Sequence, residues 1–589
     1  MGGVRTFATV DSVKELLKNN SEVEISDLTI SEWLVLRATD EINCTGIVFT
    51  NCSFSKILFN KVELNIGIKF IDCEVSGNLI FVDSSIKGYV QDFNLHNCSL
   101  EFHKLKVLGA FQMKNVNLDR GIVFRDSCEL EKMIISDVKL LNGGINFEKS
   151  SIHGICDIAN VNLTEFRFEE CEVNSQIRLS NIFCSGLCFL QSKFKRDIYI
   201  WGGAVKDHLT FNDGIFEDDV VIQAVKSSGA LTVIGSEFKT ELNVLYNDNT
   251  SKITGGCKKI YISNFSVDSR ISFIGSEDIA ELYALDEVTI YASEKLKGEI
   301  NFRNFVIDKV LLKGNNINGK IRFSHVNFQN LKLDEFTNAS KVQFYDVKSK
   351  DELQSSLEVY KSNLGVSEFY NVDLNSFKKI TIKTSILSEI IASNVTWFRK
   401  EQLHPEAGIS KELMEIEWRN NREVFRQLKY SMEKQGNKIQ SLDFKSYEME
   451  SYKQELLQQS LSNENAGNKF ILWLNQSNDY GLNFLKPLFY IFVFTIIFYC
   501  LIVVGISEKL CFSLGGGCED IKSTIKEFKS YSCGLPKMLN PIYDFSKAFP
   551  STKDKTDISF WVSFIDFLYR ILLSYLIFQL ISAFRKFVK

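Results

Sequence analysis

A short pattern of apolar and polar residues repeats along residues 42–400. Each repeat opens with an apolar, a variable and an apolar position, followed by polar residues and a further apolar one, as in IVFTNCSF, IKFIDCEV and FRFEECEV. This alternation has the period of a short strand with one buried face, and the Asn, Asp, Ser and Gly residues between the triplets indicate turns. The triplets close on a residue that recurs every ten or eleven positions, as at Phe49, Phe59, Phe70 and Phe81.

Strands this short cannot satisfy their backbone hydrogen bonds alone, whereas stacked coils satisfy one another. We therefore predict a mainly β protein, built as a parallel β-solenoid with about 22 residues per coil and followed by an α-helical hairpin and two transmembrane helices. The absence of proline before residue 400 agrees with a chain in which most N–H groups enter a ladder.

Changes in composition divide the chain into four parts. We expect an N-terminal cap at residues 1–41, because an uncovered sheet edge invites pairing with other chains. Residues 42–400 form the predicted solenoid, which we interpret as a cytosolic sensor domain. Residues 405–465 form a helical connector, and residues 466–589 form a membrane module.

Three gaps in the repeat, near residues 245–260, 275–300 and 345–380, predict inserted loops, which often carry binding sites. The sequence WGG at Trp201–Gly203 also interrupts the repeat. It fits either a bulged corner or a surface on which a nucleic-acid base stacks.

The connector lacks the strand pattern and is rich in Glu, Lys, Gln and Leu, which predicts two helices separated at Gly436. The first helix carries Leu413, Ile416, Val424, Leu428 and Met432 on one predicted face. On the second helix we expect Glu448 to be solvated or to face another subunit.

Two apolar segments, at about residues 486–506 and 558–584, are long enough to cross a bilayer. The second is followed by the basic sequence RKFVK, which the positive-inside rule assigns to the cytosol. The loop at residues 507–557 then lies on the other side. Because the first residues lack the apolar core of a signal peptide, we expect the solenoid to remain in the cytoplasm.

The second apolar segment holds the candidate functional residues. Ser563, Asp566, Arg570 and Ser574 are spaced by three, four and four residues, which places them along one stripe of a helix. An ionised side chain at the centre of a bilayer costs about 3 kcal/mol on insertion scales, so such residues normally face protein or water. Two interpretations follow: a pore lining or gate, and a salt bridge that serves packing. Two helices cannot enclose an aqueous path, so a pore requires several copies.

We interpret most of the 14 cysteines as free thiols, since Cys52, Cys73 and Cys171 lie three residues after a core phenylalanine, where a small buried side chain fits. Cys184 and Cys188 have no close histidine or second cysteine pair to complete a zinc site, so we expect no metal. The histidines are scattered, and we expect structural roles for His96, His103, His153, His208 and His325.

Catalytic motifs are missing: the sequence has no paired acid and base, nucleophile triad or phosphate loop. We therefore expect a protein that is not an enzyme, with no catalytic residues and no cofactor. The net charge of -5 excludes the broad basic surface of a duplex-DNA binder.

The stretches REVFRQLKYSMEKQGNKIQSLDFKSYEME, YGLNFLKPLF and YLIFQLISAFRKF resemble the C-terminal module of bacterial membrane proteins that join a pentapeptide-like β-helix to two channel-like helices. The overall plan is similar to that of the Hailong-type effectors of antiphage defence. The solenoid differs from strict pentapeptide repeats, because it lacks a regular A(D/N)LxX run.

This resemblance implies an effector of the bacterial inner membrane that rests as a closed homo-oligomer, for which we expect a tetramer. It further implies control by a nucleotide or a single-stranded DNA oligomer, made by a partner nucleotidyltransferase, and opening of an ion channel that depolarises the membrane. The alternative is a membrane-anchored scaffold that conducts no ions.

Overall fold

The protein is described by a computed structural model, which covers residues 6–19, 23–42, 44, 46–88, 98–246, 256–276, 282–405, 408–459, 463–507, 510, 521–550 and 559–584. The chain forms two compact units, Met1–Leu403 and His404–Lys589. His96 and the cysteines at positions 511 and 518 lie outside the described residues.

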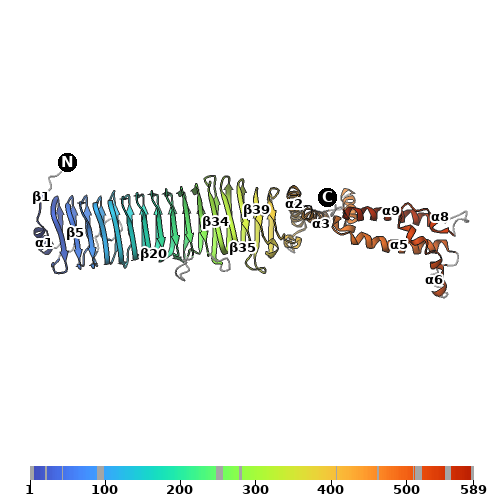
Figure 1. The fold of residues 1–589 in the computed structure, drawn as a ribbon, viewed down its shortest axis with the longest axis horizontal. Coiled ribbons are helices and arrows are strands. Elements are labelled where there is room, and N and C mark those ends of the chain that lie inside the picture. Colours follow the sequence, from blue (N-terminus) through green and yellow to red (C-terminus); the bar gives the residue numbers. More distant parts are fainter. Residues whose placement is uncertain are drawn as a thin grey trace. The chain divides into compact units, whose positions relative to one another are not determined.

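The first unit is a parallel β-solenoid (Figure 1). Its described strands form one sheet, from β1 (Thr6–Phe7) to β41 (Ile391–Ser393), in which strands bond to strands of neighbouring coils. The pairings are parallel, and register partners in the central coils are 21 to 23 residues apart. This confirms the predicted fold class and the coil length of about 22 residues.

Stacked phenylalanines fill the interior of the solenoid. One column holds Phe49, Phe70, Phe102, Phe124, Phe147, Phe168, Phe189 and Phe211, with neighbouring ring centroids 4.7 to 5.7 Å apart and nearly parallel planes. The distance between neighbouring rings matches the distance between hydrogen-bonded strands, because neighbouring rings belong to adjacent strands of successive coils. The recurring triplet residue is therefore the core residue of each coil.

Each strand of this column ends at a residue in the left-handed conformation, two positions after the core phenylalanine. Asn51 has a φ of 52° and Asp72 a φ of 51°; Asn and Asp tolerate this region better than most residues. In several coils a small buried residue follows, and it can bond to the preceding coil: Cys73 Sγ donates to the carbonyl oxygen of Phe49 at 3.3 Å. The same position holds Cys52, Ser150, Cys171 and Ser192. The described cysteines are free thiols, as expected.

The ladder begins before the predicted boundary at residue 42. Helix α1 (Val10–Asn19) lies at this end, but β2 (Val23–Ser26) and β3 (Leu28–Arg37) already pair with the following coil. The segment expected to be a cap therefore contains the first coil as well as the helix.

Two of the three predicted loops contain strands. The gap near residues 275–300 holds β33 (Tyr283–Ala292), and the gap near 345–380 holds β38 (Ser356–Tyr360). Both strands join the ladder, so the expectation of plain loops there was wrong. Inserted residues shift the phase of the repeat without interrupting the stack. Most of the first gap, residues 247–255, lies outside the described part of the chain.

The second unit begins with the predicted helical hairpin. Helices α2 (Lys411–Lys434) and α3 (Lys438–Gln458) are separated at Gly436, which has a φ of 75°. Phe425 and Phe444 pack between them. The predicted apolar face of α2 is only partly buried. Its residues Val424, Leu428 and Met432 are buried, whereas Leu413 and Ile416 are exposed.

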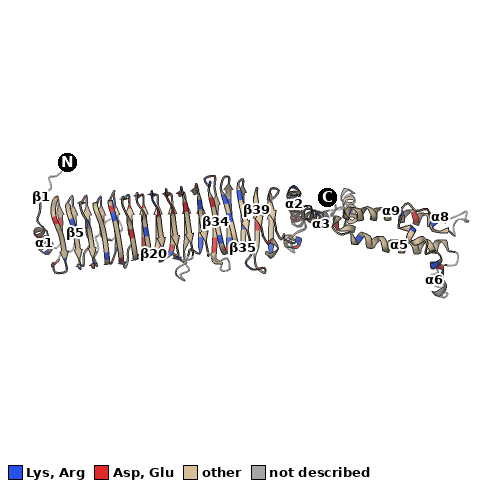
Figure 2. Ribbon diagram, in the orientation of Figure 1, with Lys and Arg blue, Asp and Glu red and all other residues tan. Residues whose placement is uncertain are grey.

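Two long helices then follow, α5 (Leu485–Ile506) and α9 (Phe560–Phe584), close to the predicted spans. Their ribbons are almost free of charged residues, in contrast to the solenoid strands (Figure 2). The shorter elements of this unit are α4 (Asn463–Asn475), η3 (Gln476–Gly481), α6 (Ile521–Ser530), α7 (Gly534–Met538) and α8 (Phe545–Ala548).

The phenylalanine column predicts a large difference between two residues of β20 (Ile177–Leu190). Phe189 is fully buried, so Phe189→Ala should reduce the free energy of unfolding by about 3–5 kcal/mol. Phe183 is half exposed, and Phe183→Ala should cost about 1 kcal/mol or less. Urea denaturation followed by the β-sheet circular dichroism signal measures both. Equal losses would contradict the assignment of the column as the core.

Candidate functional site

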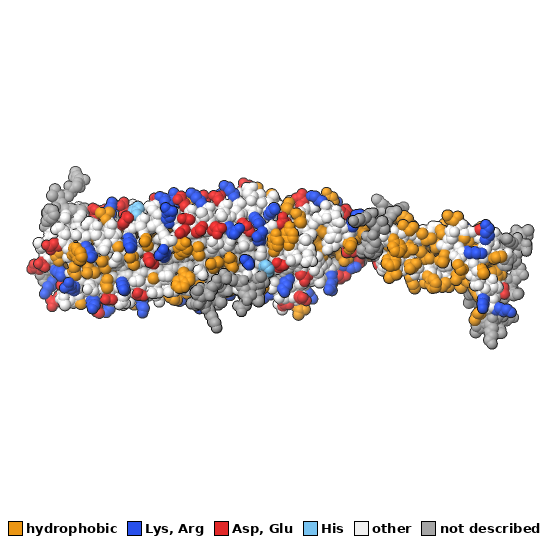
Figure 3. All heavy atoms as spheres, in the orientation of Figure 1, with side chains coloured by type: hydrophobic (Ala, Val, Ile, Leu, Met, Phe, Trp, Pro, Cys, Tyr) orange, Lys and Arg blue, Asp and Glu red, His pale blue; other side chains and the backbone are white. Residues whose placement is uncertain are grey.

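Helices α5 and α9 pack along one face of each and expose the rest. Their contact buries Ile491, Tyr499, Ile502 and Val503 of α5 against Val562, Tyr569, Leu573 and Leu576 of α9. Only 33% of the apolar window of α5 and 28% of that of α9 is buried, whereas a core helix of a soluble protein is mostly buried. Hydrophobic side chains gather on the surface over these helices (Figure 3). Both are long and apolar enough to cross a membrane.

Asp566 is buried on the face of α9 that packs toward α5 and the α7–α8 segment. One carboxylate oxygen accepts a hydrogen bond from the hydroxyl of Tyr543, and the other accepts one from Arg570 Nε at 2.8 Å. The guanidinium of Arg570 also lies over the ring of Tyr543, 4.3 Å from its centroid. The two charged residues of α9 and this tyrosine form a closed cluster, which we call the ion-pair cluster.

The four predicted stripe residues do not share one environment. Asp566 is buried, the side chain of Arg570 is 30% exposed, and Ser563 and Ser574 are exposed. A helix turns by about 100° per residue, so Asp566 is rotated by roughly 60° from Ser563, toward α5. The three other residues form what we call the polar edge of α9, beside the packed face.

Tyr543 could not be selected from the sequence, because it lies in the segment expected to be a loop. It belongs to the buried core at this end of the helices, together with Met538 and Phe549. Asp566 is six residues from the start of α9, about 9 Å along the axis at 1.5 Å per residue. The ion-pair cluster therefore lies near the end of the span rather than at its centre.

The opposite end of α9 is hydrogen-bonded to the segment that precedes α5. Asn478 Nδ2 donates to the backbone oxygen of Gln579 at 3.1 Å, and Gln579 Nε2 contacts Asn475 Oδ1 at 3.4 Å. The hydroxyl of Tyr575 bonds to Ser477 at 3.1 Å. Polar residues of α9 thus fix η3, the turn that leads into the first span.

Two acidic residues of the hairpin are buried and paired inside it, whereas we expected Glu448 to be solvated or to face another subunit. Glu448 is buried and accepts a hydrogen bond from Lys429 Nζ at 2.8 Å. Glu455, also buried, contacts Arg419 at 3.1 Å and Arg422 at 3.3 Å. These pairs hold α2 against α3, and we assign them a structural role.

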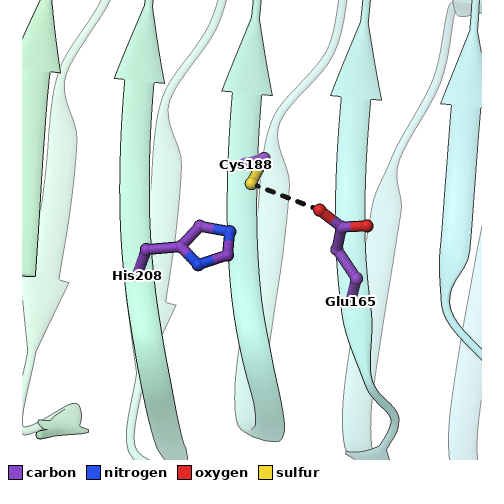
Figure 4. A group of neighbouring side chains, drawn as sticks. All are labelled: Glu165, Cys188 and His208. Atoms are coloured by element: carbon purple, nitrogen blue, oxygen red, sulfur yellow. Dashed lines mark hydrogen bonds between the residues drawn. The ribbon is translucent and has the colours of Figure 1, made fainter. Parts of the chain in front are cut away.

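Three side chains from successive solenoid coils also meet: Glu165, Cys188 and His208 (Figure 4). Their ligand-type atoms lie within 4.8 Å of one another, and Cys188 Sγ donates to Glu165 Oε1 at 3.7 Å. Burial, with a smaller effect of the Glu165 charge, raises the pKa of the Cys188 thiol to about 12. Cys184 is not part of this group. The histidine was missed because it is twenty residues from Cys188 in sequence and adjacent only through the coil repeat.

A second histidine also has partners, in an ion-pair network on the solenoid. His103 Nε2 is 2.5 Å from Glu101 Oε1, and the hydrogen bond to Glu101 raises the pKa of His103 above its ordinary value. Glu101 is fully buried and is also 3.2 Å from Lys69. These charges compensate one another, so we assign the network a structural role.

Comparison with protein-family models, with curated proteins and with solved structures finds no match to this chain.

A double-mutant cycle tests the ion-pair cluster. Asp566→Asn and Arg570→Gln should each destabilise the detergent-solubilised protein, because each leaves the partner without its counter-charge. The double variant should be more stable than the sum of the two effects predicts, by at least about 1 kcal/mol. Unfolding in mixed micelles with SDS gives these free energies.

Ser582→Ala, near the other end of α9, provides the control, since its effect should add to that of Asp566→Asn. Strict additivity of the Asp566 and Arg570 substitutions would show that the observed contact contributes nothing to stability.

Proposed function

We propose that the chain is an oligomeric membrane effector whose two spans assemble into an ion-conducting pore that depolarises the membrane. The polar edge of α9 carries this proposal. In a lone helix pair Ser563, Arg570 and Ser574 would face lipid, which is unfavourable for the guanidinium above all. Association of several copies through this edge replaces lipid by protein or by a water-filled lumen.

The proposed location is the bacterial inner membrane, with the solenoid in the cytoplasm. Lys486 at the start of α5 and the sequence RKFVK after α9 support this orientation, because two antiparallel spans place them on the same, positively charged side. The proposed partners are membrane lipid and further copies of the chain, as a tetramer. The proposed role includes no catalytic step.

We further propose that a ligand on the solenoid controls the pore, and that the protein acts in antiphage defence. The proposed signal is a nucleotide or a single-stranded DNA oligomer from a nucleotidyltransferase, as the resemblance of the C-terminal segments implies. The solenoid offers aromatic surface for such a ligand: Trp201 is 45% and Phe183 49% exposed, and nucleic-acid bases stack on such rings. A ligand shifts the closed–open equilibrium by binding one state more tightly.

Ion conduction is tested in planar bilayers with the reconstituted full chain. We expect currents from the wild type and, in Arg570→Gln, a reversal potential shifted toward cation selectivity, because a positive charge beside the lumen is removed. Arg570→Lys should retain the selectivity of the wild type. Lys206→Gln, on the solenoid surface, is the control. Currents with the same selectivity in every variant would place the lumen elsewhere, and no current under any condition would contradict conduction.

The second candidate function is a membrane-anchored scaffold. It is favoured by the completeness of the ion-pair cluster within one chain, since Asp566, Arg570 and Tyr543 satisfy one another without a lumen.

Exchange of the segment from α5 to α9 for an unrelated two-helix anchor separates the two functions. If the protein conducts, the exchanged chain should no longer depolarise cells that express it, as measured with a voltage-sensitive dye. If it is a scaffold, its biological activity should survive the exchange. Depolarisation by the exchanged chain would contradict the proposed pore.

A further inference from the structure

Cys188 differs from the cysteines that follow the core phenylalanines. Its neighbours Leu187 and Phe189 point into the solenoid and are fully buried, so the alternation of β20 places Cys188 on the outer face. Its side chain is nevertheless only 4% exposed. Cys73 and Cys171 donate to backbone carbonyl oxygens, whereas the Cys188 thiol contacts a carboxylate. An outward-facing cysteine is thus covered by polar side chains.

The covering residues come from the two adjacent coils. Glu165 begins β18 (Glu165–Glu169) and His208 lies in β23 (Ala204–Asn212), on either side of β20. Figure 4 shows the carboxylate and the imidazole turned toward the sulfur from opposite sides. Carboxylate, thiolate and imidazole are the three side-chain ligand types of zinc sites.

The separations agree with a metal site. With Zn–S and Zn–O bonds of about 2.3 and 2.1 Å, a tetrahedral ion holds sulfur and oxygen about 3.6 Å apart. Cys188 Sγ and Glu165 Oε1 are 3.7 Å apart. All three ligand atoms lie within 4.8 Å of one another, so small side-chain rotations suffice to close the triangle.

The backbone makes room for the imidazole. Gly186 is the register partner of both Glu165 and His208, and a Cβ atom at this position would lie 2.5 Å from His208 Nε2. The register also shifts between Cys184 and Gly186, where β23 contains one additional residue. Such bulges re-aim side chains and are frequent beside functional sites.

A second layer of contacts orients the carboxylate. Arg167 donates to Glu165 Oε1 at 2.9 Å and to Glu169 Oε2 at 3.2 Å. Partners of this kind fix the direction of a ligand and are typical of metal sites. The charges also balance, since a thiolate and one carboxylate offset a divalent ion and Glu169 offsets Arg167.

We propose that Glu165, Cys188 and His208 bind one divalent transition-metal ion of the Zn²⁺ class. The ion links three successive coils of the solenoid, and a fourth coordination position remains for water or an anionic ligand atom. This site is independent of ion conduction and of the signal proposed above.

The test uses the full chain in detergent, with Cys500, Cys511, Cys518 and Cys533 replaced by serine to remove the thiols of the helical unit. The protein is stripped with a chelator, dialysed against Zn²⁺ and analysed for bound metal by elemental mass spectrometry. We expect about one ion per chain, lost in Cys188→Ser and in His208→Gln. Arg167→Gln should weaken Zn²⁺ binding by roughly 10–100-fold.

His153→Ala is the matched control, because His153 is an exposed histidine of another coil that contacts Ser151 and Asn174. It should retain the metal. With Co²⁺ in place of Zn²⁺, the parent should show a sulfur-to-cobalt charge-transfer band that Cys188→Ser lacks. His208→Gln keeps the size of the side chain, and an unchanged circular dichroism spectrum verifies its fold. The proposal is overturned if the parent fails to retain metal, or if Cys188→Ser and His208→Gln retain as much metal as the parent. Either result leaves a hydrogen-bonded cluster only.

Discussion

The structure depends on one constraint: polar groups that water does not reach must find partners within the protein. In the solenoid the groups are those of the backbone. A single coil has no partner strand of its own, so each N–H and C=O bonds to the coil before or after it, and the ladder extends from β1 to β41. Because successive coils have nearly the same length, similar side chains stack on one another. This stacking produces the phenylalanine column from Phe49 to Phe211.

In the two long apolar helices, α5 and α9, the same constraint acts on side chains. Asp566 is satisfied by Tyr543 and Arg570 within one chain, while Gln579 and Tyr575 bond to the turn before α5. The polar edge of α9 differs from these groups, since Ser563 and Ser574 are exposed among apolar residues of the same helix. The proposed assembly of several copies would give this edge partners in the same way.

Period and composition predicted the solenoid, the hairpin and the two long apolar helices, because backbone hydrogen bonding and burial act on local patterns. They did not predict β33, where inserted residues change the phase of the repeat. They also paired Asp566 with Arg570 but missed Tyr543, which approaches from a segment 23 residues away. The proximity of Cys188 to His208 was also missed, although the coil length of about 22 residues would have placed the two residues on adjacent strands. Contacts across a repeat follow from its period, whereas contacts from irregular segments do not.

The central claim is that the polar edge of α9 faces water shared between copies. It is tested most directly by the reaction of Ser574→Cys with a water-soluble, membrane-impermeant thiol reagent, in reconstituted protein whose other helical-unit cysteines are serine. Leu568→Cys, at an exposed position about 120° around the axis of α9 from Ser574, is the matched comparison. A shared aqueous lumen predicts rapid modification of Ser574→Cys and little of Leu568→Cys. Protection of Ser574→Cys in every condition, or equal modification of both variants, would contradict it.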